Sequence, residues 1–471
     1  MKPRTVEDIY PLSPLQEGIL YHNLFAPETG VYLLQNACVL RNLDVPRFVS
    51  AWEKVMARHA ILRTAFVWKN LERPLQVVGR LVGLPLVQQD WCGLSPVEQA
   101  QRLETFLEND RRRSFELTRG PLMRISLFRL TPESHELVWT YNHLLLDGWS
   151  KHIVVNEVFA FYRAALQGRE LTMKPAPAFR DYIAWLQRQD LAEAEVYWRE
   201  TLRGFKVPTR LRRTDPGSRD APSQRESIDQ ERRRLPLDAS ATLQAFVRSH
   251  QLTLNTLVQG AWALLLARRS GDKDVVFGTT VSGRPPDLPG AESMVGVFIN
   301  TLPLRVQIPA DTRLLAWLQN LQVRQTTMSC HEHSPLVQVH GWSEVPRRLP
   351  LFESLFVFEN YAVDRSAWRG DGDEDGTRSP LEVRTVFLHD YPLTLIAAPG
   401  PEMLLELMYD RQRFSRGEVL QMLDEIGDLL QRMTTDPELE VDDLLLPVPD
   451  APAGVGSGVA QRQDAREEFQ F

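Results

Sequence analysis

The stretch that organises this chain is YNHLLLDGWS, residues 141–150. The apolar residues just before it predict a β-strand, and apolar side chains at helical spacing predict a helix over residues 153–166. Between strand and helix, His143, Asp147 and Gly148 form an H-x-x-x-D-G arrangement. An imidazole at a strand end can receive or position a proton of an attacking amine or hydroxyl, which favours acyl-transfer chemistry.

The same letters also have a purely structural interpretation. A single histidine beside leucines is commonly a packed, hydrogen-bonded core residue. The motif by itself therefore does not decide the function, and the rest of the chain has to.

Length and composition limit the classes of protein. The chain has 471 residues, of which 43% are apolar and 24% charged, as in a globular protein of roughly two to four compact units. No apolar run approaches the ~20 residues that span a bilayer, and no secretory signal is visible, so we expect no membrane association and a cytoplasmic location. The three cysteines are far apart and favour neither disulfides nor a cysteine zinc site. A net charge of -7 argues against a nucleic-acid partner.

Apolar periodicity switches repeatedly between about 3.6 and 2, which predicts an α/β fold. Residues 13–25 begin with a serine suited to an N-cap and predict a short helix. We expect two lobes of similar α/β character, residues 1–175 and 176–446. Residues 447–471 are rich in proline, glycine, alanine and charge, and are expected to be a linker or tail.

Further motifs flank the central loop in a fixed order. They are SPLQEGILYH (13–22), RHAILRTAF (58–66), FRDYIAWL (179–186), VSGRPP (281–286), VGVFINTLPLR (295–305), HEHSPL (331–336), GWSEVP (341–346), LFESLFVFENY (351–361) and YDRQRF (409–414). With them the chain resembles the condensation domains of nonribosomal peptide synthetases over about residues 8–446. The resemblance implies a monomer with two chloramphenicol-acetyltransferase-like lobes, forming a V-shaped pseudo-dimer around a central tunnel.

The resemblance also implies an activity and partners. The enzyme would form a peptide bond between a donor acyl or peptidyl thioester and an acceptor aminoacyl thioester. Phosphopantetheine arms on donor and acceptor carrier domains would deliver both substrates, so no cofactor is expected on this chain itself. No adenylation segment is present, so an adjacent adenylation domain is expected if the chain is part of a longer synthetase. The SPLQEG and GWSEVP runs resemble the subtype with an L donor and an L acceptor, and the D-donor and lipo-initiating subtypes are the runners-up.

Residue by residue, the resemblance gives His143 the catalytic place, either as a positioning group or as a general base. The Gly148 amide is the expected donor to the oxyanion. The family usually has a second histidine where this chain has Asn142, and an amide can replace it as a prop because it offers a donor and an acceptor. Asp147 is expected to pair with Arg284 and to clip the two lobes together.

Other residues have weaker assignments. Arg58, His59 and Arg63 are expected to support the fold. No metal site is expected, because the spacing of the histidines near residue 335 fits no zinc pattern. The expected lining of the substrate channel, with core packing as the alternative, is Ser282, Asn300 and Trp342.

Several alternatives stay open. A catalytically weakened module that binds carriers or recruits a partner enzyme is compatible with Asn142. Asn142, Asp147 and Ser150 approach the D-x-x-x-x-D-x-x-S pattern of heterocyclisation relatives, although position 142 is an amide. An epimerase relative would need an E-G-H-G-R-E-like run, and a CoA-dependent acyltransferase would need D-F-G-W-G; neither run occurs.

Overall fold

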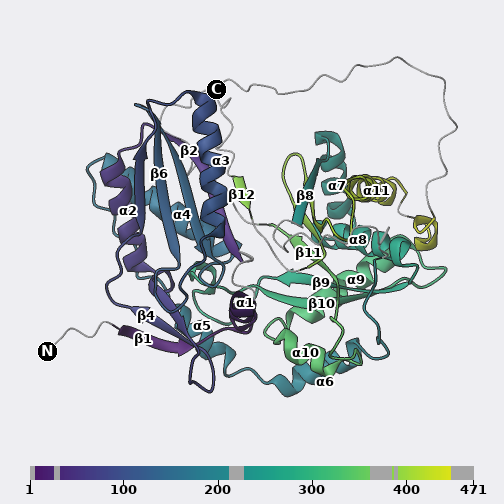
Figure 1. Cartoon of the computed structure of the whole chain (residues 1–471). Helices are drawn as coiled ribbons and strands as arrows, with labels where there is room; N and C mark the ends of the chain where they lie inside the picture. Colours follow the sequence, from purple (N-terminus) through teal and green to yellow (C-terminus); the bar gives the residue numbers. More distant parts are fainter. Residues whose placement is uncertain are drawn as a thin grey trace, which may run out of the picture.

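The computed structural model describes residues 6–25, 32–211, 228–360, 384–386, 391–436 and 438–446. Within these residues, two helix-covered β-sheets lie side by side and form two lobes (Figure 1). The α/β class predicted from the periodicity is confirmed. The predicted tail over 447–471 lies outside the described residues.

The first lobe is built on a five-stranded sheet in the order β12-β2-β7-β6-β5. The bounds are β2 (Leu33–Arg41), β5 (Leu86–Asp90), β6 (Met123–Thr131), β7 (Ser134–Asn142) and β12 (Arg384–Val386). On β7, Trp139 and Tyr141 face the larger core, whereas Val138 faces a smaller one. A strand that is covered on both faces reads as a continuous apolar run.

Helices cover both faces of this sheet. The helices α2 (Val45–Arg58) and α4 (Gly148–Leu166) pack on one face, and α3 (Pro96–Arg112) packs on the other. The helix predicted from residue 153 begins at Gly148 instead. Its N-cap, Asp147, accepts the backbone N–H of Ser150 at 2.7 Å, which satisfies a donor that the first helical turn leaves open.

A short helix and a small sheet complete the first lobe. The helix predicted over 13–25 is α1 (Pro14–Phe25), which contacts the second lobe at β10 and lies between the lobes in Figure 1. The small sheet has the order β1-β4-β3, with η2 beside it. These elements are β1 (Val6–Pro11), β3 (Thr64–Val67), β4 (Leu75–Gly79) and η2 (Ala60–Arg63).

The arginines and histidine of the RHAILRTAF motif connect elements of this lobe. Glu157 of α4 lies 3.0 Å from Arg58 Nε and 2.7 Å from His59 Nε2. Arg63 Nε donates to the Met56 carbonyl at 2.9 Å. All three side chains therefore have structural partners, in line with the fold-supporting role expected for them.

The second lobe is built on a six-stranded sheet in the order β10-β9-β11-β13-β14-β8. Its strands are β8 (Ile228–Arg234), β9 (Asp274–Val281), β10 (Asn300–Gln307), β11 (Ser354–Phe358), β13 (Leu393–Ala398) and β14 (Leu404–Asp410). Its helices are α6 (Leu191–Thr201), α7 (Leu237–Ser249), α8 (Leu254–Ser270), α9 (Leu314–Ser329), α10 (Leu336–Trp342), α11 (Arg416–Thr435) and η5 (Val441–Leu444). The short helix η3 (Ala291–Ser293), between β9 and β10, contributes Ala291 to the core of the first lobe. Helix α8 is buried on all sides from Thr256 to Ala267 and forms the centre of this core.

The two halves of the chain exchange segments. Helix α5 (Phe179–Leu186) and apolar residues between positions 288 and 298 pack into the core of the first lobe. Strand β12 pairs antiparallel with β2 and so extends the first sheet from the second half of the chain. The lobe boundary near residue 175 stays a prediction. Among the described residues, no helix is long and apolar enough to cross a membrane.

Candidate active site

His143 lies on the loop between the end of β7 and the start of α4. Its backbone N–H donates to the Tyr32 carbonyl at 2.8 Å, and its side chain is buried, with the whole residue 7% exposed. The Tyr32 ring meets the imidazole edge-on, with ring centroids 6.4 Å apart. The ring is thus held in a protein interior rather than in open solvent.

Burial lowers the pKa of His143 below its ordinary value of 6.5, because the charged form loses hydration. The carboxylate of Asp147 raises this pKa, but less than burial lowers it. The imidazole is therefore neutral at pH 7, which is the form that can accept a proton or a hydrogen bond from an amine.

The Asp147 end of the loop is fixed by the second half of the chain. The Asp147 carboxylate is fully buried and accepts the Phe298 N–H at 2.9 Å, in addition to capping α4. The Asp147 backbone N–H donates to the Gly296 carbonyl at 3.2 Å. A buried carboxylate is stable only when hydrogen bonds and a cation replace its lost hydration.

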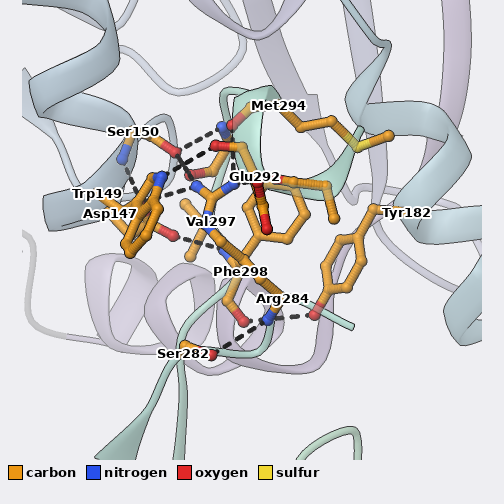
Figure 2. A network of polar contacts seen from close by, with 12 residues as sticks. Asp147, Trp149, Ser150, Tyr182, Ser282, Arg284, Glu292, Met294, Val297 and Phe298 are labelled. Atoms are coloured by element: carbon orange, nitrogen blue, oxygen red, sulfur yellow. Dashed lines mark hydrogen bonds and ion pairs between the residues drawn. The ribbon is translucent and has the colours of Figure 1, made fainter. Parts of the chain in front are cut away.

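Arg284 is the cation beside this carboxylate (Figure 2). Its Nη2 lies 3.6 Å from Asp147 Oδ1, which is too long for a hydrogen bond. The same nitrogen donates to Ser150 Oγ at 2.9 Å, and Nη1 donates to the Met294 carbonyl at 3.0 Å. The guanidinium also lies over the Phe298 ring, 4.0 Å from its centroid. The structure thus brings Asp147 and Arg284 together, with Ser150 as a shared partner.

Ser150 joins the two halves of the chain at this point. Its hydroxyl donates to the Gly296 carbonyl at 2.8 Å and accepts the Gly296 N–H at 3.0 Å. Beside it, Trp149 Nε1 donates to the Glu292 carbonyl at 3.0 Å (Figure 2). The first turn of α4 is therefore hydrogen-bonded to the segment that leads from β9 to β10.

The opposite end of the loop is held by neutral amides. The Asn142 side chain accepts the Leu144 N–H at 3.0 Å and donates to Asn23 Oδ1, also at 3.0 Å. Gln16 Nε2 donates to the Leu144 carbonyl at 2.8 Å. Asn142 is thus a hydrogen-bonded prop between β7 and α1.

The loop that carries Arg284 depends on a glycine. Gly283 has a φ of +60°, and a Cβ there would lie 1.8 Å from the Phe298 carbonyl oxygen. Its backbone N–H donates to Glu332 Oε2 at 2.9 Å, and burial raises the pKa of that carboxyl. Ser282, beside it, is exposed at this turn.

The other expected channel residues lie in the second lobe. Asn300 Nδ2 donates to the carbonyls of Glu332 at 2.9 Å and Ser334 at 2.7 Å, so its side chain braces a loop. Trp342 packs against the core of the second lobe. A channel role for these two residues and for Ser282 stays a prediction. In the described part of the chain, no group of three histidine, cysteine, aspartate or glutamate side chains could hold a metal ion.

Sequence reasoning missed three residues of the site, Gln16, Asn23 and Ser150 in its bridging role. Gln16 had a detectable signal, because it lies inside the SPLQEGILYH motif. The structure adds that this glutamine is fully buried, where it needs internal hydrogen-bond partners. Asn23 had no comparable signal, because it lies just outside that motif and asparagine is usually an exposed residue.

Comparison with known proteins places this site in a family. Residues 6–452 match the Condensation domain family. One of the proteins that make up the linear gramicidin synthase of Brevibacillus parabrevis is 47% identical over 441 residues, which cover 94% of this chain and 8% of that protein. Surfactin synthase subunit 3 of Bacillus subtilis (strain 168) is 31% identical over 442 residues, 94% of this chain and 34% of that protein. The chain therefore spans about a third or less of the length of these relatives.

Solved structures show the same fold. The first condensation domain of the calcium-dependent antibiotic synthetase, in complex with a substrate analogue, superimposes with a TM-score of 0.74 at 17% identity, covering 93% of this chain and 99% of that one. The condensation domain of the Monacolin K polyketide synthase MokA gives a TM-score of 0.74 at 18% identity, covering 93% and 100%. The predicted two-lobed, chloramphenicol-acetyltransferase-like α/β architecture is confirmed. The central tunnel stays a prediction.

The family's reaction is amide-bond formation, an acyl transfer, which is the class of chemistry expected of a neutral histidine on a hydrogen-bonded loop. The family match covers nearly the whole chain, and so does the identity to the gramicidin and surfactin synthases. The chain belongs to the condensation-domain family of nonribosomal peptide synthetases.

Proposed function

We propose that this chain joins a donor acyl or peptidyl thioester to an acceptor aminoacyl thioester through an amide bond. The observation that carries the proposal is the setting of His143, a neutral imidazole held on a loop that is hydrogen-bonded at both ends. The family match supplies the reaction class.

The acceptor amine attacks the carbonyl carbon of the donor thioester. The C–N bond forms, the C–S bond breaks, and the amine proton passes to His143 or to the departing thiolate. A free α-amine has a pKa near 8, so a sizeable fraction is already neutral at pH 7.5. Placement of the amine by His143 therefore contributes more than strong basicity would.

The first turn of α4 is suited to the developing negative charge. Gly148 is the first residue of α4, and backbone N–H groups in the first turn have no acceptor within the helix. The positive end of the helix dipole lies at the same place. We assign the Gly148 amide to the oxyanion of the tetrahedral intermediate.

The partners follow from the substrates. Phosphopantetheine arms on two carrier domains deliver donor and acceptor, and the much longer relatives support an adenylation domain beside this one. The SPLQEG and GWSEVP runs support the subtype with an L donor and an L acceptor. We expect a monomer that works in the cytoplasm.

The test mixes the chain with one carrier loaded with an aminoacyl or peptidyl donor and a second loaded with an aminoacyl acceptor. Intact-protein mass spectrometry follows the mass gain on the acceptor carrier. His143→Ala is expected to lower the rate at least a hundredfold, within the range of general acid–base and positioning effects. His250→Ala, at the end of α7, is the matched control and is expected to keep the wild-type rate.

Two outcomes would count against the proposal, the first against the role of His143 and the second against condensation itself. A mass gain that survives His143→Ala would remove His143 from the chemistry. Carrier binding without transfer, for every donor in a broad set, would favour a module that binds carriers or recruits a partner enzyme. That second outcome is the alternative that the Asn142 departure leaves open.

A further inference from the structure

The Leu144 backbone directly follows His143 and is held from both sides. Its N–H is accepted by Asn142 Oδ1 at 3.0 Å, and its C=O accepts Gln16 Nε2 at 2.8 Å. The two peptide groups that flank Leu144 are therefore both fixed by side chains. Because the first of these peptide groups is also the C-terminal side of His143, its orientation constrains the direction of the His143 Cα–Cβ bond, from which the imidazole projects.

Both side-chain contacts to the Leu144 backbone depend on residues of helix α1. Gln16 and Asn23 lie seven residues apart on α1, which is two turns, so they occupy the same helix face. Gln16 contacts Leu144 directly, whereas Asn23 acts through Asn142. Helix α1 thus forms a brace along the loop, with one amide near each end of the helix.

The amide of Asn23 has a fixed orientation. Its Nδ2 donates to the Ile19 carbonyl of its own helix at 2.7 Å, which leaves Oδ1 directed at Asn142 Nδ2, 3.0 Å away. Asn142 is 3% exposed, so the contact lies largely out of water, where a hydrogen bond gains electrostatic strength. Asn142 in turn can present Oδ1 to Leu144 only while Nδ2 faces α1.

We propose that Asn23 is a positioning residue for His143, acting through Asn142. Asn142 is then not a weakened form of the family's usual histidine. It is one half of an amide pair whose other half is supplied by α1. This inference rests on the proposed function for its catalytic consequence, whereas its structural content stands on the described contacts.

A pair of substitutions isolates the acceptor at position 23. Asn23→Asp and Asn23→Leu both remove the hydrogen bond to Ile19, but only aspartate keeps an oxygen that can accept from Asn142 Nδ2. The two variants therefore differ in the Asn23–Asn142 contact and in the charge that the aspartate adds. Glu17→Ala, an exposed change on the same helix, is the control for α1 itself.

The first measurement is hydrogen–deuterium exchange of the whole chain, resolved at the Leu144 amide. Loss of one buried hydrogen bond is worth about 1–1.5 kcal/mol, so Asn23→Leu is expected to speed this exchange roughly tenfold. Asn23→Asp and Glu17→Ala are expected to stay within about threefold of the wild type. This measurement needs no substrate.

The second measurement is the carrier-to-carrier transfer assay at pH 7.5. Asn23→Leu is expected to lower kcat about tenfold, with the KM for each loaded carrier unchanged, because a misplaced imidazole slows the chemical step and leaves carrier binding intact. Asn23→Asp is expected to keep kcat within about threefold.

The inference is overturned if Leu144 exchange in Asn23→Leu matches the wild type, or if the aspartate and leucine variants change equally. It is also overturned if the loss of transfer lies wholly in KM. A wild-type chain that transfers nothing would refute the proposed function instead, and the exchange data would still decide whether α1 braces the loop.

Discussion

The two ends of the His143 loop are held in different ways. At the Asp147 end, a fully buried carboxylate meets a guanidinium and two backbone N–H groups, one from its own helix and one from the second half of the chain. At the Asn142 end, uncharged amides of α1 and β7 support the backbone. One end is a charged network that joins the two halves of the chain, and the other is a neutral network within the first half.

The difference explains where this chain departs from the family pattern. The H-x-x-x-D-G letters are intact at Asp147 and Gly148, whereas Asn142 replaces the usual histidine. An uncharged side chain that supports the backbone can be replaced by another that offers a donor and an acceptor, provided that a neighbouring side chain supplies the matching partner. A buried carboxylate has no such substitute, because removing it leaves a cation and several N–H groups unsatisfied.

Removing the Asp147 carboxylate is expected to cause the largest loss of stability and activity. Asp147→Ala leaves Arg284 without its carboxylate, and leaves the N–H groups of Ser150 and Phe298 without acceptors. Breaking a buried pair from one side costs about 3–5 kcal/mol, so urea denaturation is expected to show that loss in the free energy of unfolding, together with loss of transfer. Asp272→Ala, at an exposed position, is expected to stay within about 0.5 kcal/mol. If Asp147→Ala keeps full activity and an unchanged urea denaturation midpoint, the structural role assigned to the Asp147–Arg284 pair is wrong.

The loop that presents Arg284 gives the next largest effect. Gly283→Ala would drive a Cβ against the Phe298 carbonyl at a positive φ, which costs roughly 2–4 kcal/mol from overpacking and backbone strain together. Gly271→Ala is a matched control, because its φ is +83° but nothing lies within 4 Å of the added Cβ. It is expected to lose only about 1 kcal/mol. Equal losses in thermal or urea unfolding would show that the close approach to Phe298 has no energetic weight.

Substitutions at the neutral Asn142 end of the loop are expected to lower the free energy of unfolding by less. Gln16→Leu leaves the buried Leu144 carbonyl without its donor, which costs about 1–3 kcal/mol. Urea unfolding measures the change, and Gln101→Leu at an exposed site of α3 provides the comparison. A loss as large as that of Asp147→Ala would contradict the ranking of the two ends.

The smallest expected effect is a shift in the pH dependence of transfer, which only the charged Asp147 end of the loop should cause. Protonation of the acceptor amine is expected to lower the rate of transfer below about pH 8. A second fall is expected as His143 becomes protonated, with a midpoint below its ordinary 6.5 because burial lowers the pKa. The Asp147 carboxylate raises this pKa by stabilising the imidazolium, so Asp147→Asn is expected to move the midpoint to lower pH. Gln16→Leu changes no charge and is expected to leave the midpoint in place. A pH–kcat profile of both variants checks the sign.

Much of the site was predictable because its signals are local. The strand into His143, the loop and the following helix lie within about 30 residues, and each has its own periodicity or cap. The Asp147–Arg284 contact was predictable only through the family resemblance, since the two residues lie far apart along the chain. The start of α4 was misplaced because Gly148 and Trp149 lack the apolar spacing of a helix, whereas the Asp147 cap sets the boundary.

The sequence by itself determined the α/β class, the family and the position of His143 between a strand and a helix, because hydrophobic periodicity and short motifs are recorded in neighbouring residues. Only the tertiary structure decided that Ser150 mediates between Asp147 and Arg284, that β12 extends the first sheet, and that α1 supports Asn142. These contacts join residues from distant parts of the chain. Their partners are chosen by how two cores pack against each other, and no local pattern along the chain records that choice.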